Sequence, residues 1–331
     1  MSEEITSIDT LTLSPQNNSA LSRPQSNPYI KAATSDNTRR TYRAAIKKFE
    51  SWGGRLPTHP EVLTQYLLTS ADKLSPRTLT VHLTALSQWH HYQSIDDPTQ
   101  HPSVRKTLEG IRRVHSKPKR KAKALRLEHL ATMLIYLNGL SESNKRSRDI
   151  ALILIAFFGA FRRSELVAIT VQDLTWEPEG LVIHILKSKT DQESQGIYRA
   201  IPKSSTGVCP VSSLKTWLDS AAIIDGPIFR AVNRWDQVQE KSLYPGSITD
   251  ILRGVGDGCQ FKFTPELSSH SFRRGLSTSA ARENIDFELI KRQGGWKSDA
   301  TVWEYIEEGG QLSGNVGHAL IDKMNNLISN D

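Results

Sequence analysis

The sequence has little of several features that define whole classes of protein. It contains two cysteines in 331 residues, Cys209 and Cys259, and no Cys-x-x-Cys pair, so no disulfide framework is expected. Its longest apolar run, 150–158, is far shorter than the roughly 18 residues that a membrane span needs. The chain opens without the basic and apolar segments of a secretion signal. We therefore expect a soluble, cytoplasmic protein with no role in a membrane.

Motifs for nucleotide-driven and metal-driven chemistry are also missing. The sequence contains no Gly-rich phosphate loop, no His-Glu-x-x-His pair and no internal repeat. We therefore expect the protein to work without a cofactor and without a metal ion.

Positive charge is abundant in one segment. The formal net charge is +7, yet residues 101–125 alone hold nine lysines and arginines and a single acid, Glu109. The run at 117–123 is expected not to pack, because its like charges repel and Pro118 breaks a helix. It is either a solvated linker or a flexible strap that lies along a polyanion such as nucleic acid. In the second case the DNA-binding cations are Lys117, Lys119, Arg120, Lys121 and Lys123.

The length predicts two domains, of which the first is helical. Residues 1–28 are rich in Ser, Thr, Asn, Gln and Pro and are expected to form a disordered tail. In 29–115, apolar residues recur on single helical faces after helix-starting residues. The four predicted helices begin at Ser35, Pro60, Ser75 and Pro102. A basic linker, 116–124, follows this all-α domain.

The remaining residues, 125–331, mix helices with strands. Residues rich in β-branched and aromatic types at 174–177, 181–186 and 198–201 predict a small antiparallel sheet. Helices are predicted near 127–137, 149–158, 211–218, 248–252, 275–282 and 287–293. The fold class is therefore mainly α with a small antiparallel β-sheet. Near the end, apolar residues at 316, 320, 324 and 327 predict a further helix, which either covers its own domain or binds a neighbouring subunit.

Three short stretches carry residues that can do chemistry. Glu165 follows Arg162 by three residues, so on a helical turn its carboxylate can orient the guanidinium. In His270-Ser271-Phe272-Arg273 the same spacing puts an imidazole beside a guanidinium. Gly294-Gly295-Trp296 is followed nine residues later by Tyr305. Each stretch by itself is typical of a structural role: a salt bridge, a hydrogen-bonded histidine or packed aromatic side chains.

In this order and spacing, the three stretches together resemble the tyrosine recombinase (phage integrase) family. Trp296, at a site where other members have His, is similar to the Cre-type branch. The resemblance covers the chain after about residue 30. It implies a four-helix, SAM-like domain that binds core DNA, a basic linker, and an α+β catalytic domain with a C-terminal oligomerisation tail.

The family also has a catalytic lysine in a β-hairpin, at a place that corresponds to the end of the second predicted strand. We choose Lys189 because it precedes Thr190, as in the Cre-type pattern. Lys187 stays open, because strand alternation gives both lysines the same facing. Arg163 and Arg274 adjoin the motif arginines and are interpreted as salt-bridge or backbone-contact residues.

The residue types suit cleavage of a DNA phosphodiester without metal or ATP. The planar forks of Arg162 and Arg273 stay ionised and donate paired hydrogen bonds to the non-bridging oxygens. The other implied roles are hydrogen-bond donation by His270 and Trp296, orientation of Arg162 by Glu165, protonation of the departing 5′-oxygen by Lys189, and attack on phosphorus by Tyr305. The attack forms a 3′-phosphotyrosyl bond, which conserves the energy of the broken linkage.

The resemblance implies a site-specific recombinase of a bacterium, phage or mobile element, associated with the nucleoid. Its expected partners are double-stranded DNA with short inverted-repeat target sites and further copies of the chain in a synaptic homotetramer. A type IB topoisomerase shares the chemistry but acts alone, and the helical domain, the strap and the tail argue against it. An architectural DNA-binding relative without catalysis is disfavoured, because every expected catalytic position is filled.

Overall fold

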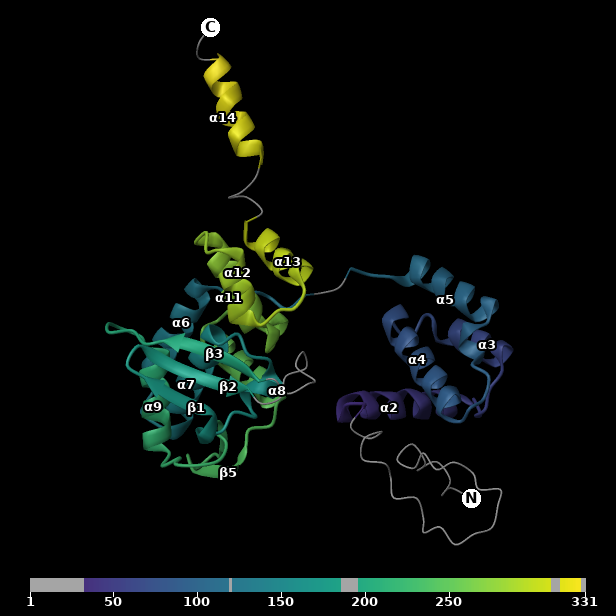
Figure 1. Ribbon diagram of the computed structural model, residues 1–331, viewed down its shortest axis with the longest axis horizontal. Helices are drawn as coiled ribbons and strands as arrows, with labels where there is room; N and C mark the ends of the chain where they lie inside the picture. Colours follow the sequence, from purple (N-terminus) through teal and green to yellow (C-terminus); the bar gives the residue numbers. More distant parts are fainter. Residues whose placement is uncertain (1–32, 119–120, 186–195, 311–315, 329–331) are drawn as a thin grey trace. The chain divides into compact units, whose positions relative to one another are not determined.

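The structure is a computed structural model that describes residues 33–118, 121–185, 196–310 and 316–328 (Figure 1). The chain divides into two compact units, Met1–Lys119 and Arg120–Asp331, which we describe one at a time. The described elements are mostly helices with small antiparallel sheets, so the predicted fold class is confirmed. The finer limits of the tail, the domains and the linker remain predictions. Among the described helices, none has both the length and the apolar character that a bilayer crossing requires.

In the first unit, the described elements are α2 (Asp36–Trp52), α3 (Pro60–Ser70), α4 (Pro76–Tyr92), the 3-10 turn η1 (Pro98–Gln100) and α5 (Pro102–His115). The predicted helix starts are confirmed to within one residue, because local signals define them. Ser35 and Ser75 each cap a helix by accepting a hydrogen bond from the backbone N–H three residues further on. Gly53 ends α2 with a left-handed φ of +112°.

The apolar faces of these four helices meet in one core. Phe49 of α2 packs edge-on against Tyr66 of α3, with ring centroids 5.2 Å apart. The Tyr66 hydroxyl and the His82 ring nitrogen Nδ1 of α4 form a hydrogen bond of 2.6 Å. Burial raises the pKa of Tyr66 to about 12 and lowers the pKa of His82 below its ordinary value. The core of the first unit therefore favours the uncharged forms of this polar pair.

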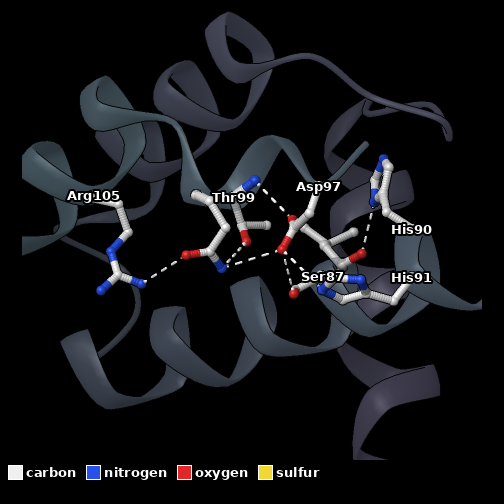
Figure 2. Close-up of polar contacts among 8 residues, drawn as sticks. Ser87, His90, His91, Asp97, Thr99 and Arg105 are labelled. Atoms are coloured by element: carbon white, nitrogen blue, oxygen red, sulfur yellow. Dashed lines mark hydrogen bonds and ion pairs between the residues drawn. The ribbon is translucent and has the colours of Figure 1, made fainter. Parts of the chain in front are cut away.

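A second polar group, built around Asp97, links α4 to η1 (Figure 2). The Asp97 carboxylate accepts hydrogen bonds from the Ser87 hydroxyl at 2.6 Å, the Thr99 backbone N–H at 2.9 Å and the Gln100 amide at 3.2 Å. The His91 ring lies 3.5 Å away. Burial raises the pKa of Asp97, but the hydrogen bonds outweigh burial and bring the pKa below its ordinary 3.8. The charged form of Asp97 is thus favoured by the fold.

The second unit contains the remaining described elements. Its helices are α6 (Leu127–Asn138), α7 (Asn144–Phe158), α8 (Arg163–Leu166), α9 (Pro210–Ser220), α10 (Ser247–Gly258), α11 (His270–Arg282), α12 (Phe287–Gly294), α13 (Asp299–Gly310) and α14 (Val316–Ile328). The 3-10 turns are η2 (Val171–Asp173) and η3 (Thr264–Glu266). Its strands are β1 (Leu174–Glu177), β2 (Gly180–Ile185), β3 (Ile197–Pro202), β4 (Arg230–Val232) and β5 (Val238–Ser242).

The main core of the second unit is formed by buried residues of α6, α7, α9 and α10 together with strands β2 and β3. Strands β1, β2 and β3 pair antiparallel in that order, and alternate residues of β2 are buried. Helix α7 is buried from Ala151 to Phe157, which explains its unbroken apolar run. Helices α11, α12 and α13 lie side by side (Figure 1) and enclose a smaller apolar cluster of Ile290, Trp296 and Val302.

Several described elements differ from their prediction, among them α10, which runs to Gly258 rather than to 252. Helix α7 begins at Asn144 rather than at 149, because Ser143 caps a polar first turn that shows no apolar periodicity. Helix α11 begins at His270 rather than at 275, because its first turn is largely polar and shows no apolar periodicity; Ser269 precedes it without a side-chain cap. Helix α13 and the β4–β5 hairpin were not predicted. The hairpin is held by a distant contact, since the Asp236 carboxylate accepts hydrogen bonds from the backbone at the start of α7.

Candidate active site

Arg162 lies directly before α8, where the chain leaves the buried helix α7. Its backbone N–H donates to the Glu165 carboxylate at 2.9 Å, and its guanidinium donates to the same carboxylate at 2.5 Å. Glu165 is buried, while Arg162 keeps part of its surface exposed. The two side chains therefore meet as their spacing predicts, and the acid holds the guanidinium in one orientation.

Arg273 of α11 is buried, with 3% of its surface exposed. Its guanidinium donates to the carbonyl of Ala160, two residues before Arg162, and to the carbonyl of Gly294 at 3.0 Å. It also lies 4.6 Å from the centre of the Trp296 ring. Burial, followed by the positive charge of Arg162, lowers the pKa of Arg273 to about 10. One side chain thus joins the first predicted stretch to the third.

Trp296 and Tyr305 come together through a turn and a helix. Gly295 ends α12 with φ of +58°, a left-handed conformation that glycine adopts readily, and the chain then places the Trp296 ring in the small apolar cluster. The ring centroids of Trp296 and Tyr305 are 5.6 Å apart. The Arg274 guanidinium lies 5.7 Å from the Tyr305 ring, so this neighbour of the motif arginine contacts an aromatic side chain of the site.

Two further predicted site residues are His270 and Lys189. His270 is the first residue of α11, exposed and one turn before the buried Arg273. Its backbone N–H donates to the Ser268 hydroxyl at 3.3 Å. Lys189 lies outside the described residues, as does its alternative Lys187. The flanking strands β2 and β3 pair antiparallel, from the pair Gly180 and Pro202 to the pair Ile185 and Ile197.

The predicted DNA-binding cations are only partly described. Lys117 is exposed, and Lys119 and Arg120 lie outside the described residues. Lys121 forms an ion pair with Glu304, the residue before Tyr305.

The expectation that the basic run 117–123 cannot pack is wrong for its last residue, Lys123. The backbone N–H of Lys123 donates to the Glu266 carbonyl at 3.1 Å, and that of Leu125 donates to Ser271 at 3.0 Å. Gly275 of α11 makes room for this segment, because a Cβ there would lie 1.8 Å from the Leu125 carbonyl oxygen. Only the backbone takes part in these hydrogen bonds. The side chains of Lys121 and Lys123 stay exposed to solvent, so the repulsion between their charges does not prevent the backbone from packing.

Sequence reasoning missed two residues that border the site, Arg199 and Gln293. Arg199 of β3 is buried, with 3% of its surface exposed, although it is charged. The Gln293 amide donates to the carbonyls of Phe158 and Ala200 at 2.7 and 3.1 Å, which ties the end of α12 to α7 and β3. An arginine at an inward position of a predicted strand was the available signal. Within the described ranges, no group of three or more His, Cys, Asp or Glu could hold a metal ion.

Guanidinium groups match the geometry of phosphate and stabilise the charge that develops on it during transfer. A model of the phage integrase family matches residues 123–309 of this chain. The integrase/recombinase xerD homolog of Selenomonas ruminantium is 34% identical over 308 residues, which cover 89% of this chain and 88% of that protein. The chain therefore belongs to the phage integrase family, and it is a tyrosine-type site-specific recombinase.

Solved structures of recombinases share the fold. The XerH site-specific recombinase, bound to a palindromic difH substrate in a post-cleavage complex, matches with a TM-score of 0.58 and 17% identity, over 83% of this chain and 80% of that chain. A lambda integrase dimer bound to a COC′ core site matches with a TM-score of 0.59 and 17% identity, over 85% and 75%. The likeness to the Cre-type branch, which rests on Trp296, remains a prediction.

Proposed function

We propose that the protein cleaves and rejoins DNA strands through a covalent 3′-phosphotyrosyl intermediate on Tyr305. One observation carries this proposal: Arg273 contacts Trp296, Trp296 contacts Tyr305, and Arg273 also donates to the backbone beside Arg162. Residues more than 140 positions apart in the sequence thus form one connected group. Such preorganised donors stabilise the charge that develops on a phosphate in the transition state.

In the proposed reaction, Arg162 and Arg273 hold the non-bridging oxygens, and His270 and the indole N–H of Trp296 add donors. The Tyr305 hydroxyl releases its proton to solvent, and its oxygen forms a bond to phosphorus as the bond from phosphorus to the 5′-oxygen breaks. Lys189 gives the departing 5′-oxygen a proton, with Lys187 as the alternative donor. Religation reverses these steps with a new 5′-hydroxyl, so the reaction needs neither metal nor ATP.

The proposed substrate is double-stranded DNA with short inverted-repeat sites. The similar XerH recombinase is bound to a palindromic substrate, and the similar lambda integrase is a dimer on a core site. Lysines 117, 119, 121 and 123 and Arg120 supply the charge for phosphate contacts along the duplex. We place this activity in the bacterial cytoplasm, on the nucleoid.

We further propose that the enzyme works as a homotetramer held together by α14. Five apolar residues of this helix are each more than half exposed: Leu320, Ile321, Met324, Leu327 and Ile328. Such a face favours burial against a partner, and the partner we propose is a neighbouring subunit. Deletion of the residues after Leu312 should abolish the tetramer on DNA, measured by sedimentation or native mass spectrometry. A tetramer that survives the deletion would contradict this role of α14.

The nucleophile is tested with a nicked suicide substrate that traps the covalent complex. Wild type and Tyr244→Phe, a control at an exposed tyrosine of the second unit, should capture DNA equally. Tyr305→Phe should capture none while binding DNA with unchanged affinity, because it lacks the attacking oxygen. Covalent capture by Tyr305→Phe would rule out this nucleophile.

The general acid is tested with a bridging 5′-sulfur substrate, whose leaving group needs little protonation. If Lys189 is the acid, Lys189→Ala should cleave the normal substrate poorly and the sulfur substrate at nearly the wild-type rate. The same rescue seen with Lys187→Ala instead would assign the role to Lys187.

A further inference from the structure

Arg199 is a buried cation that the proposed reaction does not use. It lies in the middle of β3, opposite Ile183 of β2, and faces inward while its neighbours Tyr198 and Ala200 are exposed. A charged side chain at such a position is unusual, because burial disfavours its charge. Its surroundings therefore require an explanation.

The Arg199 guanidinium lies against the turn that leads to Trp296. A Cβ added to Gly295 would lie 1.9 Å from Nη2 of Arg199, so the side chain occupies the space that glycine leaves open. Nη1 donates to the Arg292 carbonyl at the long distance of 3.4 Å. Among the residues that the structure describes, Nε has no hydrogen-bond partner. Hydrogen bonding thus compensates this buried charge only weakly.

The nearby charges leave an excess of positive potential. Burial lowers the pKa of Arg199, Glu165 acts against that shift, and Arg162 adds to it. Glu165 is already bound to Arg162, so its carboxylate offsets one guanidinium and is shared with the others. Among the residues that the structure describes, the group formed by Arg162, Arg199, Arg273 and Glu165 therefore carries more positive than negative charge. A phosphate at this place would supply the missing negative charge.

We propose that Arg199 is a positioning residue of the recombination site. Its guanidinium supports the Gly294–Gly295 turn, whose Gly294 carbonyl accepts from Arg273 and whose next residue is Trp296. Its charge adds to the field on the phosphate without touching it. Through Ala200, β3 also binds Gln293, so the strand that follows the Lys189 segment is locked to the end of α12. This inference rests on the proposed function.

The test compares full-length variants in single-turnover cleavage of the nicked substrate, DNA binding and thermal unfolding. Arg199→Met removes the charge and keeps a long side chain, and Arg199→Lys keeps the charge. Arg230→Met is the matched control, because Arg230 of β4 also donates to backbone carbonyls, and its partners in the described part of the chain, Pro227 and Asp225, are not motif residues. Arg199→Met should slow cleavage roughly 10- to 100-fold, by analogy with residues that orient the ligands of metal sites. DNA affinity should change little, and Arg199→Lys should recover most of the rate.

Gly295→Ala provides a second variant that does not depend on removal of the buried charge. Its methyl group displaces the guanidinium, so we expect slower cleavage with retained DNA binding. Arg199→Met that cleaves at the wild-type rate would overturn the inference. A second outcome would also overturn it: Arg199→Met and Arg199→Lys both cleave slowly, and the loss of cleavage rate parallels a loss of thermal stability. If wild type itself forms no Tyr305-dependent adduct, the proposed function fails and this inference fails with it.

Discussion

Asp97 in the first unit and Arg273 in the second are both largely buried charges, but their surroundings treat the charge in opposite ways. Around Asp97, three neutral donors outweigh burial and lower the carboxyl pKa, so the fold favours the ion. Around Arg273, burial and a neighbouring cation lower the guanidinium pKa, so the fold opposes the ion. A charge that its environment stabilises contributes to folding. A charge kept against its environment points to a bound anion and to function.

The largest expected effect is the loss of cleavage when the buried charge of Arg273 is removed. Arg273→Gln should reduce single-turnover cleavage by about 100- to 1,000-fold, because it removes a preorganised donor to the phosphate. The free energy of unfolding should change by about 1 kcal/mol or less, since relief of the buried charge offsets the lost bonds to Ala160 and Gly294. Rapid-quench cleavage assays and denaturant titrations measure the two quantities. A variant that unfolds readily yet cleaves normally would reverse our assignment.

Asp97 should show the opposite result. Asp97→Asn should lower the free energy of unfolding by about 1–3 kcal/mol, because an amide cannot accept hydrogen bonds from all three donors. The folded Asp97→Asn protein should cleave DNA at the wild-type rate. Asp96→Asn, at the exposed neighbouring position, is the matched control and should leave stability unchanged. Hydrogen exchange in α4 and η1 would locate the loss, and unchanged exchange there would count against a structural role.

The pH dependence of stability sharpens the same comparison. Because the folded-state pKa of Asp97 is below the ordinary 3.8, its stabilising contribution is complete above pH 3.8. The contribution is lost as the pH falls through the lower folded-state pKa. The difference in unfolding free energy between wild type and Asp97→Asn should therefore be constant near neutral pH and shrink in strong acid. Denaturant titrations across this range measure it, and a difference that grows in acid would show that our sign is wrong.

The smallest expected effect concerns an exposed charge. Lys121 and Glu304 form a surface ion pair, so Lys121→Met should change the free energy of unfolding by less than about 1 kcal/mol. If Lys121 contacts a DNA phosphate, the same variant should reduce the salt dependence of binding by about one counterion. Lys215→Met, at an exposed lysine of α9, should leave the slope unchanged. An unchanged slope for Lys121→Met would remove this lysine from the DNA contacts.

Local signals made much of the fold predictable. The helix starts of the first unit are set by single residues: the side chains of Ser35 and Ser75 cap two helices, and prolines 60, 76 and 102 occupy first helical positions. The three strands of the sheet were predicted to within one residue at each end. Elements held by distant residues were harder to predict. The β4–β5 hairpin depends on Asp236 binding the start of α7, a contact that spans about 90 positions.

The order and spacing of Arg162, Glu165, His270, Arg273, Trp296 and Tyr305 are properties of the sequence, and they were sufficient to predict the family. The sequence also determined where helices start, because caps and apolar periodicity act over a few residues. Only the tertiary structure decided that the Arg199 side chain packs against the turn before Trp296 and that Arg273 is buried. Burial and electrostatic potential depend on neighbours brought from far along the chain, and a linear pattern does not contain them.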